Sequence, residues 1–187
     1  MPITALDPHT ALIVVDLQKG TTSRPTAHPI DQVVARAAEL VSAFRGRGLP
    51  VVLARFDPST SAPRRSELGG APGTVPPEFA EFVPGIAATD QDIVVTKGGW
   101  SAFTGTGLAQ TLRERGVTQV VLAGVATTFG VESTARSAHD EGFHVTVATD
   151  AVTDPVAESH ERAVRGLFRI LGETGETADI VNALGQP

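Results

Sequence analysis

Two apolar segments of the sequence each end in a charged residue that could take part in acid–base chemistry. Asp16 follows the run that begins at Thr10, with Gln18 just beyond it, and Lys97 follows the run that begins at Asp92. Only two of the fifteen cationic residues are lysines, so a lysine at this place is unusual for this chain. A buried ammonium beside Asp16 would offset part of the desolvation cost of both charges. The two residues predict an acid and its electrostatic partner, although Lys97 could equally end a strand and point to water.

A glycine marks a third candidate position, in the segment LAGVATTFGVESTAR at residues 122–136. An apolar run ends there in small residues and is followed by a helical pattern, with Gly130 in the first turn. Glycine is about 0.5–1 kcal/mol less favourable than alanine inside a helix. Its place at the end of a buried strand therefore needs an explanation other than helix propensity.

For other polar and aromatic residues near these strand ends, the sequence allows either a structural or a functional role. Trp100, the sole tryptophan, follows a Gly-Gly pair and could form a pocket wall or fill the core. Arg64 and Arg65 are adjacent and could steer an anionic substrate, or could be solvated surface charges. Asp150 and Asp154 are predicted to order a loop rather than to catalyse, because TDAVTD is typical of a turn that leads into a helix.

The composition excludes several classes of site and partner. The sequence contains no cysteine, which rules out disulfides, thiolate metal ligands and thiol nucleophiles. The five histidines lack ligand-like spacing, so we expect no metal and no cofactor. A net charge of −6 gives no electrostatic case for nucleic acid or an anionic membrane. With no signal peptide and no run of about 20 apolar residues, we expect a cytoplasmic, soluble protein.

An alternation of short apolar runs and amphipathic segments must position these residues. Strands are predicted at residues 10–18, 50–56, 92–97, 118–126, 143–150 and, near the C-terminus, 178–181 (ADIV). Helices are predicted at residues 30–45, 108–115, 128–141 and 156–171. This pattern predicts one α/β domain over residues 1–187, with a mostly parallel sheet and helices on both faces. Residues 57–90, rich in Pro, Gly, Ser and Ala, predict a partly ordered loop over the site.

Three segments of the sequence resemble the isochorismatase-like hydrolases, also called the cysteine hydrolase superfamily. They are ALIVVDLQ around Asp16, TKGGWSAFTGTGL around Lys97, and VVLAGVATTFGVESTARSAHDEGFHVTVATDAVTD. They occur in the order and with the spacing of that family. The resemblance implies a Rossmann-like, three-layer α/β/α architecture whose six-stranded, mainly parallel sheet has the order 3-2-1-4-5-6. It also implies a homo-oligomer, a dimer or a tetramer.

The resemblance also implies the residues of the site. In that family an Asp, a Lys and a Cys act together, and these positions correspond to Asp16, Lys97 and Gly130. A cis peptide bond is implied between Val125 and Ala126, which would aim backbone N–H groups at a negatively charged oxygen. The implied substrate-binding residues are Gln18, Trp100, Val125, Ala126, Thr127 and Phe129, with Arg64 and Arg65 from the long loop. The metal-binding Asp-x-His of nicotinamidases is missing, so nicotinamide is not the expected substrate.

Three functions remain open at this point. The first is cysteine-independent hydrolysis of an isochorismate-type enol ether or a related carboxylated metabolite, with Asp16 as general acid and Lys97 as its partner. The second is a slow hydrolase in which Asp16 activates water against an amide or an ester, which the amidase-like VESTAR segment favours. The third is a non-catalytic binding protein that keeps the pocket. Turnover of a substrate panel separates the first two, and ligand binding without turnover indicates the third.

Overall fold

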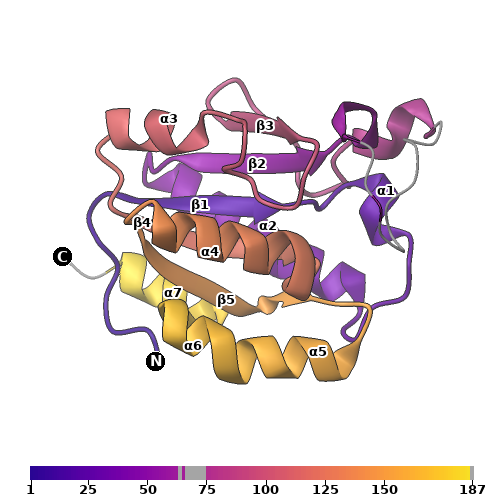
Figure 1. Cartoon of the computed structure of the whole chain (residues 1–187). Coiled ribbons are helices and arrows are strands. Elements are labelled where there is room, and N and C mark those ends of the chain that lie inside the picture. The colour runs from indigo at the N-terminus through magenta and orange to yellow at the C-terminus, as the bar shows by residue number, and fades with distance from the viewer. Residues whose placement is uncertain (63–64, 66–74, 186–187) are drawn as a thin grey trace.

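Six parallel strands form the central sheet in the computed structural model, which describes residues 1–62, 65 and 75–185 (Figure 1). In chain order they are β1 (Thr10–Val15), β2 (Val51–Phe56), β3 (Ile93–Lys97), β4 (Gln119–Val125), β5 (His144–Thr153) and β6 (Glu173–Gly175). Their order in the sheet is β3-β2-β1-β4-β5-β6, and every neighbouring pair is parallel. The predicted α/β class and strand order are confirmed. Parallel strands end at one edge, which is where open α/β sheets bind ligands.

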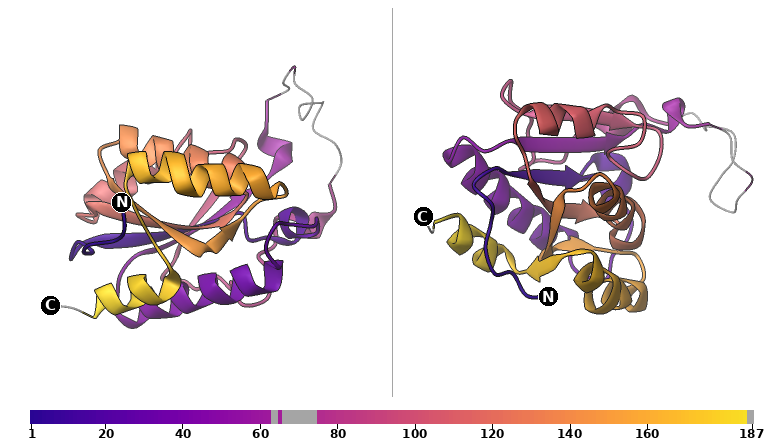
Figure 2. Two further views of the ribbon diagram at one scale, coloured as in Figure 1. Left: turned by 90° about the horizontal axis from the view of Figure 1, so that it is seen from below. Right: turned by 60° about the vertical axis from the view of Figure 1, so that its left-hand side comes forward.

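Helices cover both faces of the sheet (Figure 2). One face carries α3 (Leu108–Glu114), α4 (Glu132–Asp140) and a continuous helix made of α5 (Ala157–Arg162), η4 (Ala163–Leu167) and α6 (Phe168–Leu171). The opposite face carries α2 (Ile30–Gly46) and α7 (Thr177–Leu184). Each face has its own apolar core, in which Phe168 and Phe44 respectively are fully buried. Because β1 and β4 lie between the two cores, their apolar residues are buried on both sides, as their continuous apolar sequence predicts.

Gly124 allows the two central strands to approach each other at their carboxyl ends. It pairs with Val15 across the β1–β4 ladder and has a φ of +118°, a backbone conformation that favours glycine. A Cβ atom added there would lie 2.0 Å from the carbonyl oxygen of Val15. A larger residue would therefore separate the strands directly before Asp16.

The prediction of a strand at residues 178–181 is wrong. These residues lie inside α7, and the sixth strand is β6, immediately before it. A capping box between Glu176 and Asp179 begins the helix, with the Glu176 backbone N–H donating to the Asp179 carboxylate over 3.1 Å. Ile180 and Leu184, four residues apart, then pack on the core. A four-residue apolar run does not distinguish a strand from one turn of a buried helix.

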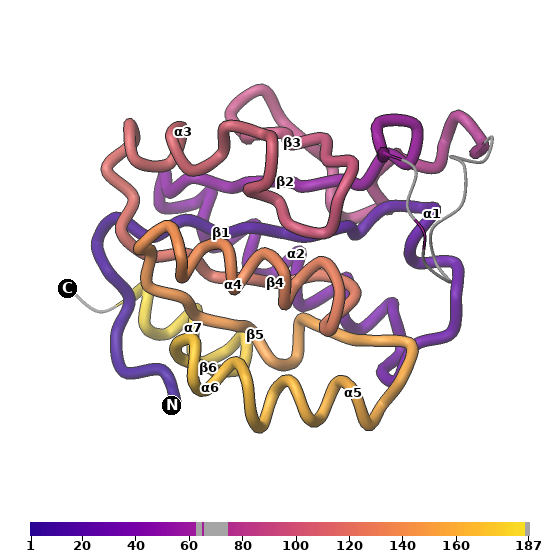
Figure 3. The backbone as a smooth tube through the Cα atoms, viewed as in Figure 1, coloured from indigo at the N-terminus to yellow at the C-terminus, as the bar shows by residue number. Residues whose placement is uncertain are grey.

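The segments after β1 and β2 are irregular and pack against each other. After β1 the chain forms α1 (Lys19–Thr22) and then runs along one end of the sheet towards α2 (Figure 3). Within the predicted loop of residues 57–90, the described residues form two short 3-10 helices, η1 (Pro58–Thr60) and η2 (Pro77–Ala80). The Lys19 backbone N–H donates to the carbonyl of Glu81 over 2.9 Å, which holds η2 beside α1. In the described part of the chain, the helices are all too short or too polar to cross a membrane.

Candidate active site

Asp16 stands in a sharp turn at the carboxyl end of β1. Its φ is +53°, in the left-handed region that Asp tolerates better than most residues. Its backbone N–H donates to the carbonyl of Ala54 on β2 over 2.8 Å, and its own carbonyl accepts hydrogen bonds from the Gln18 N–H and the Thr21 hydroxyl. The neighbouring strand and the first turn after β1 therefore fix the backbone that carries this carboxyl group.

Lys97, the last residue of β3, reaches the carboxyl group of Asp16 across the end of β2. Its Nζ lies 2.6 Å from Asp16 Oδ2, and it also donates to the carbonyl of Gly99 over 3.2 Å. Lys97 is 2% exposed and Asp16 is 7% exposed, so this is a buried ion pair and not a strand cap that points to water. The Lys97 ammonium also lies 5.7 Å from the ring centroid of Phe56, within the range of a cation–π contact.

Burial raises the pKa of Asp16 from 3.8 to about 6, while the charge and hydrogen bond of Lys97 act in the opposite direction. The cost of desolvation is therefore larger than the stabilisation by the ammonium. Asp16 Oδ1 is buried and accepts no hydrogen bond from the part of the chain that the structure describes, so an ionised carboxylate is incompletely solvated there. A carboxyl group with this pKa is protonated at mildly acidic pH and can serve as an acid.

Gly130 faces this pair from the first turn after β4. It is buried within η3 (Thr127–Val131), which leads into α4, and the peptide bond between Val125 and Ala126 before it is cis. A Cβ atom added to Gly130 would lie 2.9 Å from Asp16 Oδ2 and 3.1 Å from the carbonyl oxygen of Val125. The carboxyl group of Asp16 thus borders the space that a side chain at position 130 would need.

A cavity of about 300 Å³ opens above Asp16, Lys97 and Gly130. Its other lining residues come from α1 and the segment after it, from η2, from the carboxyl ends of β2, β3 and β4, and from the segment before α5: Gly20, Thr21, Arg24, Thr26, Phe56, Phe79, Gly99, Trp100, Val125, Ala126, Phe129 and Pro155. Trp100 is 54% exposed and packs edge-on against Phe129, with the ring centroids 5.3 Å apart. Trp100 therefore forms a wall of the pocket and does not fill the core.

Gln18 supports the pocket from outside it. Its side chain is fully buried, and its amide nitrogen donates to the carbonyls of Phe56 and Phe79 over 2.8 and 3.0 Å. Its amide oxygen accepts the N–H of Phe56 over 2.6 Å. Gln18 is absent from the lining residues of the cavity, so its place is that of a positioning residue for two aromatic walls.

The structure separates other predicted substrate-binding residues from the cavity. Thr127 is fully buried, and its hydroxyl lies 2.9 Å from Nδ1 of His160. Arg65 is exposed and is not one of the residues that line the cavity, and Arg64 lies outside the described residues. Val125, Ala126 and Phe129 are among the residues that line the cavity.

Asp154 orders a loop, as predicted, whereas Asp150 lies inside β5, so the prediction of a turn is wrong for residues 149–153. Asp154 is 1% exposed, and its Oδ2 accepts both the backbone N–H and the hydroxyl of Thr128 over 2.8 Å. Asp150 Oδ1 accepts the backbone N–H and the hydroxyl of Thr177 over 2.7 and 2.8 Å. Asp154 thus fixes the turn that presents Gly130, while Asp150 fixes the start of α7.

Sequence reasoning missed Arg24, Phe79 and Gly20. Arg24 is an exposed cation that follows α1, and Phe79 comes from η2 in the long loop. Gly20 permits this wall, because a Cβ atom added to Gly20 would lie 2.2 Å from the ring of Phe79. The sequence does place Gly20 four residues and Arg24 eight residues after Asp16. That segment has no regular hydrophobic pattern, so periodicity could not predict its structure.

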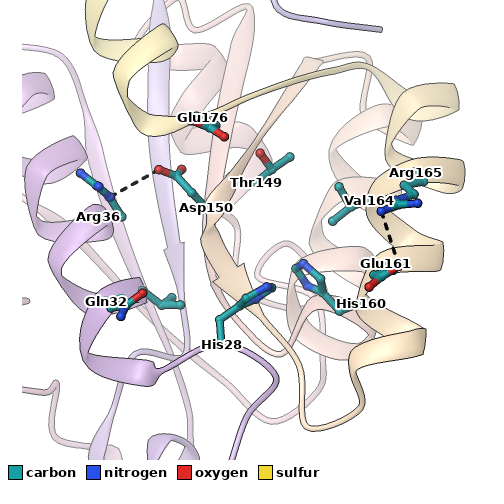
Figure 4. Close-up of a pocket in the computed structure, with 11 residues that line it drawn as sticks. His28, Gln32, Arg36, Thr149, Asp150, His160, Glu161, Val164, Arg165 and Glu176 are labelled. Atoms are coloured by element: carbon teal, nitrogen blue, oxygen red, sulfur yellow. Dashed lines mark ion pairs between the residues drawn. The ribbon is translucent and has the colours of Figure 1, made fainter.

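A second cavity of about 510 Å³ lies between α2 and the helix formed by α5 and η4 (Figure 4). Four of its charged residues form two ion pairs: Arg36 lies 3.5 Å from Asp150, and Arg165 lies 3.6 Å from Glu161. Side chains held in such pairs are weaker candidates for catalysis than Asp16, which is buried beneath the smaller cavity. Among residues 1–62, 65 and 75–185, no group of three His, Asp or Glu side chains is placed to hold a metal ion.

Comparisons with known proteins identify the family to which the chain belongs. A model of the Isochorismatase domain matches residues 10–179. YecD, an isochorismatase family protein of Escherichia coli O157:H7, is 38% identical over 94% of this chain and 96% of its own length. An isochorismatase family protein of Burkholderia thailandensis has a solved structure that superposes with a TM-score of 0.92, at 38% identity over 97% of this chain and 98% of that one. The chain therefore belongs to the isochorismatase family.

Proposed function

We propose that this member of a family of hydrolases cleaves the enol ether of a small carboxylated metabolite of the isochorismate type, without a covalent enzyme intermediate. The observation that carries the proposal is the buried pair of Asp16 and Lys97 at the floor of the cavity, with Gly130 beside it and no cysteine in the sequence. We infer that Gly130 stands where the nucleophilic cysteine of related hydrolases stands. The chemistry then depends on an acid and on water.

In this mechanism the protonated Asp16 donates its proton to the methylene carbon of the enol ether. The new C–H bond uses the electrons of the double bond and leaves an oxocarbenium ion. Water adds to the cationic carbon and gives a hemiketal. The hemiketal breaks the bond between that carbon and the oxygen attached to the ring, the proton of its hydroxyl passes to this oxygen, and pyruvate and an alcohol leave. The proton lost by the attacking water restores the acid. The pKa of Asp16, raised to about 6, supports the role of the acid, because general acids work best when their pKa is near the working pH.

Lys97 supports the same step by electrostatics. Its ammonium stabilises the carboxylate that Asp16 becomes when it loses the proton, and it stays 2.6 Å from that carboxylate within the buried site. The curated isochorismatase of Bacillus subtilis is 29% identical over 84% of this chain and 53% of its own length, so the chain spans about half of that protein. This relative favours enol-ether hydrolysis.

A second candidate is water-mediated hydrolysis of an amide. The ureidoacrylate amidohydrolase RutB of Methylobacterium radiotolerans is 32% identical over 98% of this chain and 83% of its own length. In this alternative Asp16 acts in its ionised form as a general base for water, so activity would rise with pH through the pKa of Asp16. The same residue would therefore give opposite pH dependences in the two mechanisms.

The deciding experiment measures pyruvate release from isochorismate, beside ammonia release from ureidoacrylate and maleamate. The first proposal predicts pyruvate release that falls as the pH rises above about 6 and that Asp16→Asn abolishes. Asp31→Asn, an exposed acid on α2, is the matched control and should retain wild-type activity. Ammonia release with no pyruvate would favour the amidase, and binding of these compounds without turnover of any would overturn both.

A further inference from the structure

The cavity above Asp16 has one cation that no carboxylate neutralises within the described part of the chain. Lys97 is paired with Asp16, whereas Arg24 lines the same cavity and takes part in no ion pair among the described residues. Arg24 is exposed, while the ion pair is buried. The cavity therefore has an ion pair at its floor and, among the described residues, a guanidinium without an ion pair at its rim.

Aromatic side chains form the walls of the cavity between the ion pair at its floor and Arg24 at its rim. Phe56 and Phe79 stand together with their ring centroids 6.4 Å apart, and Trp100 and Phe129 form a second edge-on pair. Aromatic surfaces of this kind favour an apolar ring in the ligand, because they can bury it without forming hydrogen bonds to it. A volume of about 300 Å³ limits the ligand to about one ring with a short substituent.

We propose that Arg24 binds a carboxylate on the ring of the substrate, and that it makes the site selective for cyclic acids that carry a carboxylate on the ring. The guanidinium offers a planar pair of N–H donors that matches the two oxygens of a carboxylate. With the ring carboxylate at Arg24 on the rim, the ring lies between the aromatic walls and its ether substituent reaches Asp16. This assignment rests on the proposed function for the identity of the reacting bond, but the binding of the ring acid does not depend on turnover.

Binding of benzoate and benzamide to the folded protein, measured by calorimetry, tests the assignment without chemistry. The two probes share the ring and differ in charge. We expect Arg24→Gln to weaken benzoate binding about tenfold, Arg24→Lys to recover part of it, and benzamide binding to change little in either variant. Arg162→Gln removes an exposed arginine of α5 that does not line this cavity, and it should leave both affinities unchanged.

Steady-state kinetics with isochorismate add a second readout. Arg24→Gln should raise KM about tenfold, more than it lowers kcat, because its contact is made in both the ground state and the transition state. Equal benzoate affinities in wild type and Arg24→Gln, or no saturable benzoate binding by the wild type, would overturn the assignment. Benzoate binding that depends on Arg24, with no pyruvate release from isochorismate, would refute the proposed function and leave the role of Arg24 in place.

Discussion

The carboxyl group of Asp16 should titrate near pH 6 in the folded protein, well above its ordinary value of 3.8. Between these two values the folded protein keeps a proton that the unfolded chain has lost. The contribution of Asp16 to the free energy of unfolding is therefore full below pH 3.8 and falls as the pH rises through 6. The total change is about 3 kcal/mol, since one pKa unit corresponds to about 1.36 kcal/mol.

Replacing Lys97 by methionine should move this titration further upwards. The Lys97 ammonium, 2.6 Å from the carboxylate, is what holds the pKa of Asp16 down against burial. An opposite charge at such a distance lowers a carboxyl pKa by about one to three units, so the midpoint should rise to between about 7 and 9 in Lys97→Met. Methionine fills a similar buried volume without a charge, which limits the loss of packing.

Carbon-13 NMR of the aspartate carboxyl groups measures both midpoints directly, and Asp16→Asn identifies the resonance. Lys19→Met removes the other lysine, an exposed residue paired with Glu81, and is the matched control; its Asp16 midpoint should stay near 6. A midpoint in Lys97→Met at or below that of the wild type would refute the electrostatic reasoning. A wild-type midpoint near 3.8 would refute the claim that burial affects the pKa of Asp16 more strongly than Lys97 does.

Two further predictions concern the glycines that shape the site. Gly130→Ala should lower the free energy of unfolding in urea by about 1–3 kcal/mol, because its Cβ would lie 2.9 Å from Asp16 Oδ2. Gly166→Ala, in a helix with open space around it, should be neutral or stabilising, and equal losses in both variants would contradict the steric reasoning. Gly124→Ala should cost about 3 kcal/mol or more, since its φ is +118° and its Cβ would lie 2.0 Å from the Val15 carbonyl oxygen; a wild-type Tm would contradict this.

The sequence predicts the sheet well because five of its six strands carry a local signal. After a polar first residue, β1 and β4 are almost continuously apolar, so their place in the chain and their burial on both faces can be predicted, although β1 ends three residues earlier than predicted. The signal fails at β6, a three-residue strand with no apolar run. The apolar residues nearby belong to α7, whose start depends on side-chain capping and on Asp150, a contact between distant parts of the chain.

The ion pair at the floor of the cavity can be predicted from the sequence because its residues lie at the ends of predicted strands. The residues at the rim cannot be predicted in this way. Asp16 directly follows β1 and Lys97 ends β3, and a parallel sheet brings these strand ends to one edge, so their proximity follows from topology. Phe79 and Arg24 come from irregular segments, and the place of Phe79 depends on tertiary contacts such as the hydrogen bond from the Gln18 side chain to its carbonyl. Tertiary contacts of this kind leave no periodic pattern in the sequence.

The absence of a side chain at position 130 and the raised pKa of Asp16 favour the same chemistry. A carboxyl group that activates a neighbouring nucleophile must be ionised, whereas an acid must hold its proton. With a pKa of about 6, Asp16 is about one-tenth protonated at pH 7 and half protonated one unit lower. Because Gly130 presents no group to deprotonate, the proposed mechanism places the substrate itself beside the carboxyl group. The proton of Asp16 is then available to the substrate, which is what hydrolysis of an enol ether requires.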